Sequence, residues 1–248
     1  MSDYRDFARF YDALTLNIDY LKRTQYLCTL FDLYNFKPNL ILDLACGTGS
    51  FAINLHDLGY DMIACDSSVQ MLSAAKNKAA LLKKDILFLH QSMTDFDLYG
   101  TVDCVVCCLD SINHLILKSD VKRTFEKVSL FLNPGGLFIF DVNTIYKHNS
   151  ILADNTFIYD LENLFCVWQN SLLKNNLIKI NLDFFERENS NYNRYTEEFY
   201  EKAYSIEEIL LLLKQSGLNI LGFFDELTLN EPNEKSQRIF FVAGKPAV

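Results

Sequence analysis

Hydrophobic positions in the central part of the chain follow two alternating periods. Short apolar runs, such as Leu40–Leu44 and 137–142, are typical of strands that are buried on both faces of a parallel sheet. Between such runs the apolar residues recur every three or four positions, as Val121, Phe125 and Val128 do, which is typical of helices. Strand and helix patterns alternate five times. We therefore predict an α/β fold with a doubly wound, mostly parallel sheet joined by right-handed crossovers.

Capping and turn residues set the predicted ends of these elements. Ser67 or Ser68 caps the helix that follows the second strand. Ser119 or Asp120 caps the helix before the fifth strand, and the Asn-Pro-Gly-Gly turn at 133–136 ends that helix. Each of these helices is thus expected to connect two strands of one sheet.

Residues 156–204 follow a different pattern, in which apolar and polar residues alternate. Ile178, Ile180 and Leu182 would face one side of a strand while their polar neighbours face the other. Asparagine-rich turns interrupt this pattern, so we predict an inserted antiparallel sheet of three or four strands. The segment follows the fifth strand and is rich in aromatic residues. We expect it to form a lid over the binding edge of the main sheet or a dimer surface.

Both ends of the chain belong to the main domain. Residues 1–37 carry helical apolar stripes that predict a helical cap, and Pro38 separates them from the first strand. A capping box at 205–208 begins a leucine-rich helix, and two more strands are predicted at 218–228 and 236–244. The predicted domains are 1–155 together with 205–248, and the inserted sheet 156–204.

Charge and composition argue against several classes of protein. The formal net charge of −9 argues against a nucleic-acid surface, which needs clustered Lys and Arg. No apolar run approaches the roughly 18–20 residues that span a bilayer. The N-terminal residues also lack the apolar core of a signal peptide. We therefore expect a cytoplasmic protein that does not associate with a membrane.

The seven cysteines are scattered along the chain, and this odd number is typical of reduced thiols in the cytosol. Cys104 and Cys107 form a CxxC pattern inside an apolar, strand-like run. No second Cys or His pair accompanies them at the spacing that zinc requires. The sequence therefore predicts buried strand cysteines and no metal site.

The segment Leu40–Ala52 combines a buried strand, a glycine turn and the start of a helix, as nucleotide-binding corners do. Gly47 and Gly49 let a ligand approach bare backbone, but they also satisfy a dinucleotide fingerprint, so they leave the ligand open. Asp43 beside the turn would repel a pyrophosphate and favour a ligand with an ammonium group. S-adenosylmethionine brings an adenosine and an ammonium group without a phosphate.

Four motifs together resemble the class I S-adenosylmethionine-dependent methyltransferases, in particular the group that acts on small molecules. They are LDLACGTG at 42–49, CDSS at 65–68, QSMTDF at 91–96, and the turn at 133–136 that precedes FIFDV. The resemblance implies a Rossmann-like, seven-stranded sheet whose last strand is antiparallel, and the two predicted C-terminal strands agree with it. The implied cofactor is S-adenosylmethionine.

The resemblance also assigns roles to single residues. It places Gly47 and Gly49 close to the methionine part of the cofactor. It also places Asp43 at the cofactor's amino group, directly or through water, and Asp66 at the ribose hydroxyls. Ser92 stands where the family often has an acidic residue, so its hydroxyl and the Met93 amide are expected at the adenine. The cofactor-binding residues expected on this basis are Tyr11, Asp43, Ala45, Cys46, Gly47, Gly49, Asp66, Ser67, Met71, Ser92, Met93 and Leu109.

Two of these residues have an equally good structural interpretation. Tyr11 lies in a segment that resembles the cap over the cofactor, where its hydroxyl could donate to the cofactor carboxylate, but it could equally be a packing residue. Met71 resembles the apolar cover on the adenine, and it suits the core of a helix just as well.

Methyl transfer from a sulfonium is an in-line displacement that needs an aligned nucleophile, and a base only where the nucleophile must lose a proton. The residues after the fourth strand lie at the switch point of the predicted sheet, where ligands bind. Asp110 and His114 there could orient or deprotonate an acceptor, although His114 could also be structural. Asp141 and Asn143, at the end of the fifth strand, border the same edge.

We therefore expect an enzyme that transfers a methyl group from S-adenosylmethionine to a nitrogen, oxygen or carbon atom of a small molecule. The alternatives are a protein or RNA methyltransferase and a non-catalytic S-adenosylmethionine-binding protein. Asp43 disfavours a dehydrogenase. The chain is expected to be a monomer or a homodimer.

Overall fold

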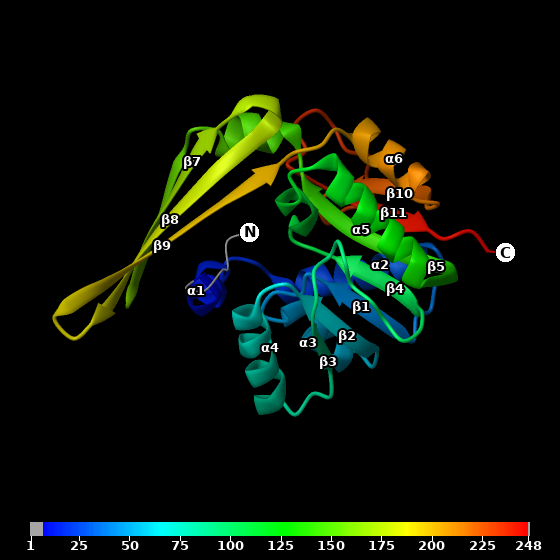
Figure 1. Ribbon diagram of the computed structural model, residues 1–248, viewed down its shortest axis with the longest axis horizontal. Coiled ribbons are helices and arrows are strands. Elements are labelled where there is room, and N and C mark those ends of the chain that lie inside the picture. The colour runs from blue at the N-terminus through cyan, green and yellow to red at the C-terminus, as the bar shows by residue number, and fades with distance from the viewer. Residues whose placement is uncertain (1–6, 248) are drawn as a thin grey trace.

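A seven-stranded sheet forms the centre of the computed structural model, which describes residues 7–247 (Figure 1). Its strands are β1 (Leu40–Leu44), β2 (Asp61–Asp66), β3 (Leu87–His90), β4 (Val102–Cys107), β5 (Leu132–Asn143), β10 (Asn219–Asp225) and β11 (Arg238–Gly244). They lie in the order β10-β11-β5-β4-β1-β2-β3, and only β11 runs antiparallel to its neighbours. The predicted doubly wound sheet with an antiparallel last strand is confirmed.

Helices cover both faces of this sheet. Helices α2 (Tyr20–Leu33), α3 (Ser50–Asp57) and α4 (Val69–Leu81) bury their apolar side chains in one core on one face. Helices α5 (Lys118–Phe131) and α6 (Ile206–Gln215) pack in a second core on the other face. Within residues 7–247, no helix has both the length and the hydropathy that crossing a bilayer requires.

The direction of the connections changes between β1 and β4. From β1 the chain proceeds through α3 to β2 and on to β3, and it then returns to the other side of β1 to form β4. Ligands of open α/β sheets bind beside such a switch point, at the carboxyl ends of the strands. The loops that follow β1, β2 and β4 therefore meet at the expected binding edge.

Two predicted boundaries are wrong. Helix α5 begins at Lys118, and neither Ser119 nor Asp120 caps it, because the chain leaves the preceding turn in an extended conformation at Leu117. The helix ends at Phe131, before the Asn-Pro-Gly-Gly turn. That turn lies within β5, where the pairing with β4 shifts by several residues. The sequence predicted that this turn ends the helix, whereas the structure places its residues in the irregular first part of β5.

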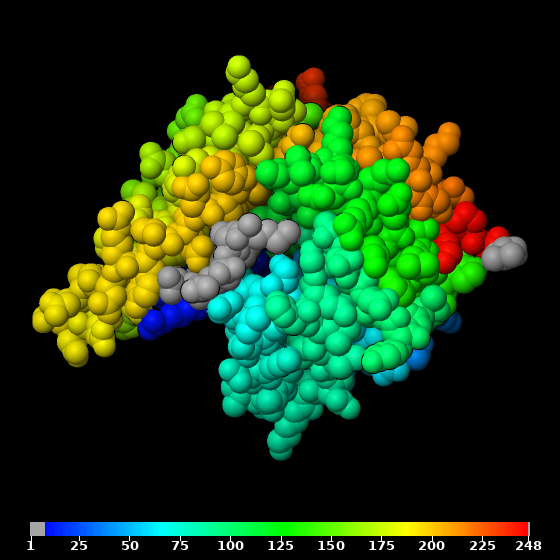
Figure 2. Space-filling view, viewed as in Figure 1, coloured from blue at the N-terminus to red at the C-terminus, as the bar shows by residue number. Residues whose placement is uncertain are grey.

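The inserted segment forms a separate antiparallel sheet, as predicted. Its strands are β6 (Thr156–Leu161), β7 (Leu164–Leu172), β8 (Leu177–Glu188) and β9 (Asn191–Lys202), in that order. This sheet projects from the main body as a long arm (Figures 1 and 2). Helix α1 (Phe7–Leu14) packs on it, and the ring of Phe10 stacks on Phe184 at 4.9 Å between centroids. The predicted helical cap thus contacts the inserted sheet.

The CxxC cysteines lie in β4. Cys104 and Cys107 are both fully buried in the two cores that flank the main sheet. Burial raises the pKa of both thiols, so they stay protonated at neutral pH. The prediction of buried strand cysteines is confirmed.

Candidate active site

The turn after β1 presents bare backbone to a cavity. Ala45, Gly47 and Gly49 all have positive φ angles, of 61°, 54° and 77°. A Cβ atom on Gly47 would meet no atom within 4 Å, because the residue faces the cavity. A Cβ atom on Gly49 would lie 3.0 Å from the Cβ atom of Ala75, so this glycine allows α3 and α4 to approach each other. The two glycines therefore serve different purposes.

Asp66, at the carboxyl end of β2, joins two loops at the cavity. Its carboxylate accepts hydrogen bonds from the backbone N–H groups of Gly47 and Ser68, each at 2.8 Å. Burial raises the pKa of Asp66 above its usual value, although these hydrogen bonds counteract the increase. The carboxylate also lines the cavity, where it can accept hydrogen bonds from a ligand.

Asp43 forms part of the cavity wall from inside β1. It is 2% exposed and accepts a hydrogen bond of 3.1 Å from the N–H of Ala52 in the first turn of α3. Burial raises the pKa of Asp43 to about 7. A buried carboxyl group at this position favours a ligand that brings a positive charge.

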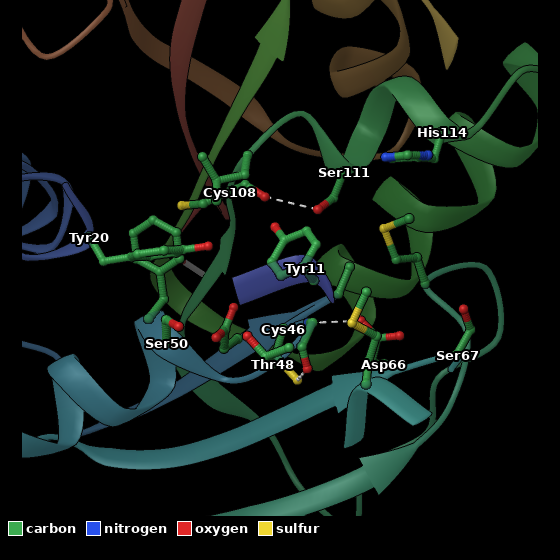
Figure 3. Close-up of a pocket in the computed structure, with 17 residues that line it drawn as sticks. Tyr11, Tyr20, Cys46, Thr48, Ser50, Asp66, Ser67, Cys108, Ser111 and His114 are labelled. Carbon is green, nitrogen blue, oxygen red and sulfur yellow. Dashed lines mark hydrogen bonds between the residues drawn. The ribbon is translucent and has the colours of Figure 1, made fainter. Parts of the chain in front are cut away.

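We call this space the cofactor cavity (Figure 3). Asp66 and Thr48 lie on one side of it, and Cys108, Ser111 and His114 lie on the opposite side. The predicted residues that line it are Tyr11, Asp43, Ala45, Cys46, Gly47, Asp66, Ser67, Met71, Met93 and Leu109. Met71 is also buried in the first turn of α4, where the Ser68 hydroxyl caps its N–H, so both interpretations of this residue hold.

Two predicted residues lie outside this lining. Gly49 is the N-cap of α3, at the end of the turn, and it does not line the cavity. The Ser92 hydroxyl lies 3.0 Å from the hydroxyl of Thr94 and accepts the N–H of that residue, and Ser92 does not line the cavity. The prediction also missed lining residues, namely Tyr20, Thr48, Ser50, Phe51, Cys108 and Ser111. The glycine motif could have pointed to Thr48, Ser50 and Phe51, because these residues are part of it or directly follow it. No local motif surrounds Tyr20, so the sequence alone gives no reason to place it in the cavity.

A second cavity adjoins the first, between the main sheet and the inserted sheet. Tyr11, Leu109 and His114 line both cavities, so the two spaces share a wall. Residues of both sheets contribute polar side chains to the wall of the second cavity. Its charged residues are Asp19, Lys22, Arg23, Asp110, Lys147, Glu201, Glu226 and Arg238.

Asp110 is held in place by its neighbours. The backbone N–H groups of Leu109 and Asp110 each donate to the buried carboxylate of Asp141 at 2.8 Å, which secures two consecutive residues with positive φ. Arg238 pairs with both carboxylates, at 2.5 Å from Asp110. Burial raises the pKa of Asp110, but the Arg238 guanidinium outweighs this and holds the pKa at about 2. Asp110 is therefore a very weak base, and of the two roles expected from the sequence this low pKa favours orientation of an acceptor over its deprotonation.

His114, Glu201 and His148 form a row, of which His114 and Glu201 line the second cavity and His148 is fully buried. The Glu201 carboxyl group lies 3.8 Å from Nε2 of His114 on one side and 3.8 Å from Nε2 of His148 on the other. Burial lowers the pKa of His114, lowers that of His148 to about 4, and raises that of Glu201 to about 8. At neutral pH the row is therefore uncharged. Glu201, on β9, was not predicted.

The comparisons with known proteins agree with this geometry. A family model described as "Methyltransferase domain" matches residues 41–136. The protein named "Putative methyltransferase YqeM" from Bacillus subtilis is 35% identical over 98% of this chain and 97% of its own length. The crystal structure of an S-adenosylmethionine-dependent methyltransferase from Clostridium acetobutylicum has a TM-score of 0.89 at 34% identity, covering 98% of this chain and 99% of that one.

A more distant structure shares the fold. The sugar N-methyltransferase KedS8 from Streptoalloteichus has a TM-score of 0.79 at 17% identity, covering 95% of this chain and 92% of that one. The similarity to the Bacillus and Clostridium proteins extends over nearly the whole chain, and the range matched by the family model includes the positions of the glycine turn and Asp66. The chain therefore belongs to the S-adenosylmethionine-dependent methyltransferases, with S-adenosylmethionine as its cofactor.

Proposed function

We propose that this enzyme transfers the methyl group of S-adenosylmethionine to an amine nitrogen of a small molecule held in the second cavity. The observation that carries this proposal is the cluster of Asp110, His114 and Glu201. One ligand atom of each lies within 4.8 Å of the others, and all three residues line the second cavity. His114 also lines the cofactor cavity, so the cluster borders both sites.

The residues of the cofactor cavity fit S-adenosylmethionine. Asp66 presents a carboxylate to ribose hydroxyls, and Asp43 presents a buried carboxyl group to the amino group of the methionine part. The open space at Gly47 leaves the backbone free for close approach. When bound, the cofactor supplies an electrophilic methyl group on a sulfonium. Among the described residues that line this cavity there is no cluster of Lys or Arg, which a pyrophosphate would require.

The spacing of the cluster suits a nitrogen atom. Hydrogen-bond partners at about 2.9 Å around one tetrahedral nitrogen lie about 4.7 Å from one another. A primary amine has four tetrahedral directions, which are its carbon substituent, two N–H groups and the lone pair. Two members of the cluster can therefore accept its N–H groups while the lone pair stays free to attack the methyl group. Holding the nucleophile in this alignment supplies much of the rate acceleration of an in-line displacement. A divalent cation at the same place would have to displace Arg238 from Asp110.

The ionisation of the cluster suits the removal of a proton from an ammonium group. An amine attacks only when its lone pair is free, so a protonated acceptor must first lose a proton. His114 is neutral at physiological pH because burial lowers its pKa, and it can accept that proton. Asp110 stays ionised beside Arg238 and orients the N–H groups of the amine. Glu201 lies on the inserted sheet and offers a carboxyl oxygen atom as a further hydrogen-bond partner for the amine.

Two observations favour a small molecule over a protein or RNA as acceptor. The second cavity lies between the two sheets, and residues of α1 and of the start of α2 line it as well. Among the described residues of its wall, four Lys and Arg side chains are accompanied by four Asp and Glu side chains, so the wall is not a basic surface for a polyanion. KedS8, which shares the fold over nearly the whole chain, is named a sugar N-methyltransferase. We keep a cytoplasmic location as part of this proposal.

The proposal is tested by methyl transfer from S-adenosylmethionine labelled with ¹³C at its methyl group, using a panel of small primary and secondary amines and matched alcohols. We expect an N-methyl product, formed equally well with a chelator present. Glu201→Gln removes an ionisable oxygen from the cluster, whereas Glu198→Gln changes an exposed residue of the same strand and serves as the control. Label in a methyl ether, or only in added protein or RNA, would overturn the proposal.

A further inference from the structure

We propose that the acceptor carries an anionic group, a carboxylate or a phosphate, and that Lys147 binds this group in the second cavity. This inference rests on the proposed function and specifies which amines the site takes. It starts from a lysine whose ammonium group has no acidic partner in the part of the chain that the structure describes.

Lys147 follows β5 and lines the second cavity. Its Nζ atom donates a hydrogen bond of 2.8 Å to Oδ1 of Asn143, which leaves two of its three N–H donors without a protein acceptor. Among residues 7–247, no carboxylate lies within ion-pair distance of Nζ. Buried charges in proteins are paired. A ligand that supplies the missing anion would meet this requirement.

The acidic residues of the cavity wall are all engaged elsewhere. Asp110 and Glu226 both contact Arg238, and Glu226 also pairs with Arg23 at 2.5 Å. Asp19 caps α2 by accepting the N–H of Lys22 at 2.9 Å.

The fourth acidic residue, Glu201, lies between two imidazoles, and burial keeps it protonated at neutral pH. The two arginines of the wall are likewise occupied by Glu226 and the other carboxylates. Lys22, the other cation of this wall that pairs with no carboxylate among residues 7–247, is exposed. Lys147 is therefore the half-buried cation of the wall that remains available to a ligand.

The position of Lys147 links the anionic group to the amine. Asn143 accepts the hydrogen bond from Lys147, and its own amide nitrogen lies 3.5 Å from Oε2 of Glu201. One side chain thus separates the lysine from the cluster that is proposed to hold the amine. A molecule that spans both has its amine and its anionic group only a few bonds apart, as in an amino acid or an amino-alkyl phosphate.

The test is a calorimetric titration of the full-length protein saturated with S-adenosylhomocysteine. The probes are inorganic phosphate, acetate and glycine, each added to the wild type and to Lys147→Met, Lys147→Arg and Lys76→Met. Lys76 is exposed on α4 outside both cavities and serves as the control. Binding of S-adenosylhomocysteine by each variant shows that it is folded, and Lys147→Gln replaces Lys147→Met if the latter is not.

We expect saturable, millimolar binding of at least one probe to the wild type. Loss of a charge-assisted hydrogen bond should weaken it about tenfold in Lys147→Met, with little change in Lys147→Arg or Lys76→Met. Tighter binding of phosphate than of acetate assigns a phosphate. Tighter binding of glycine than of acetate assigns a carboxylate beside an amine. The inference is overturned if none of the three probes binds, or if Lys147→Met binds them as the wild type does. Methylation of neutral amines would then still support the proposed function.

Discussion

The Glu201 carboxyl group lies 3.8 Å from Nε2 of His114, and this contact joins the inserted sheet to the main sheet. His114 ends the short 3₁₀-helix that follows β4, whereas Glu201 lies near the end of β9. The ring of Phe199 also lies 5.4 Å from the His114 ring, between centroids. The proposed amine site is therefore assembled only when the two sheets are docked.

His114→Gln should lower kcat by about a hundredfold, because the variant retains a polar side chain but cannot accept a proton from the amine. Burial places the pKa of His114 below its usual 6.5, so the wild-type rate should fall at a pH below that usual value, where His114 becomes protonated. This acidic limb of the pH–rate profile should be weaker in the variant. An unchanged rate and an unchanged limb would show that His114 is structural.

Asp66→Ala should weaken cofactor binding by roughly ten- to a hundredfold, since a carboxylate that accepts ribose hydroxyls is lost. Isothermal titration with S-adenosylhomocysteine measures this effect. Asp61→Ala is the matched control, because Asp61 is exposed and lies at the other end of the same strand, β2. Equal affinities of the two variants would place the ribose elsewhere.

Asp43 should make the protein without cofactor less stable as the pH rises. Burial raises the pKa of this group in the folded protein to about 7, from an ordinary value of 3.8, so the folded state binds more protons than the unfolded state between these values. The free energy of unfolding from this group therefore falls as pH rises from about 4 to about 7, and it is constant above that.

Asp43→Asn keeps an acceptor for the N–H of Ala52 and removes the titration. At about pH 8 we expect the variant to be more stable than the wild type, by on the order of 3 kcal/mol. Urea unfolding at several pH values measures this difference, with Asp61→Asn as the control. Parallel pH dependences of Asp43→Asn and the wild type would contradict the assignment.

Arg238→Met should destabilise the protein by about 3–5 kcal/mol, because it leaves the carboxylates of Asp110 and Asp141 without their shared cation. For a chain of this length that corresponds to a decrease in Tm of roughly 10 °C. Adding Asp141→Asn to the variant should restore part of the stability. A Tm unaffected by Arg238→Met would mean that these ion pairs contribute nothing to the fold.

The part of the candidate site that could be predicted from the sequence is the cofactor cavity, because many of its residues lie within one local motif. Asp43, Gly47 and Asp66 follow from a strand, a turn and the end of the next strand, because their geometry is set within the β1–α3–β2 unit. Glu201 and Arg238 could not be found in this way. Their positions depend on the pairing of β9 with β8 and of β11 with β5, which is specified by packing between distant segments.

The environment of Asp110 could not be predicted for the same reason. Its sequence position, directly after β4, suggests a group that is free to act as a base. Arg238, from the antiparallel strand β11, pairs with it and stabilises its ionised form. Ser92 illustrates a smaller effect, since its hydroxyl contacts that of Thr94 and the residue does not line the cofactor cavity.

The most direct test of the central claim is a crystal structure of the protein with S-adenosylhomocysteine. We predict the ribose hydroxyls within hydrogen-bond distance of Asp66, the amino group near Asp43, and the sulfur atom facing the cluster of Asp110, His114 and Glu201 across the wall that the two cavities share. A sulfur atom separated from that cluster by protein, or a ribose away from Asp66, would contradict the account.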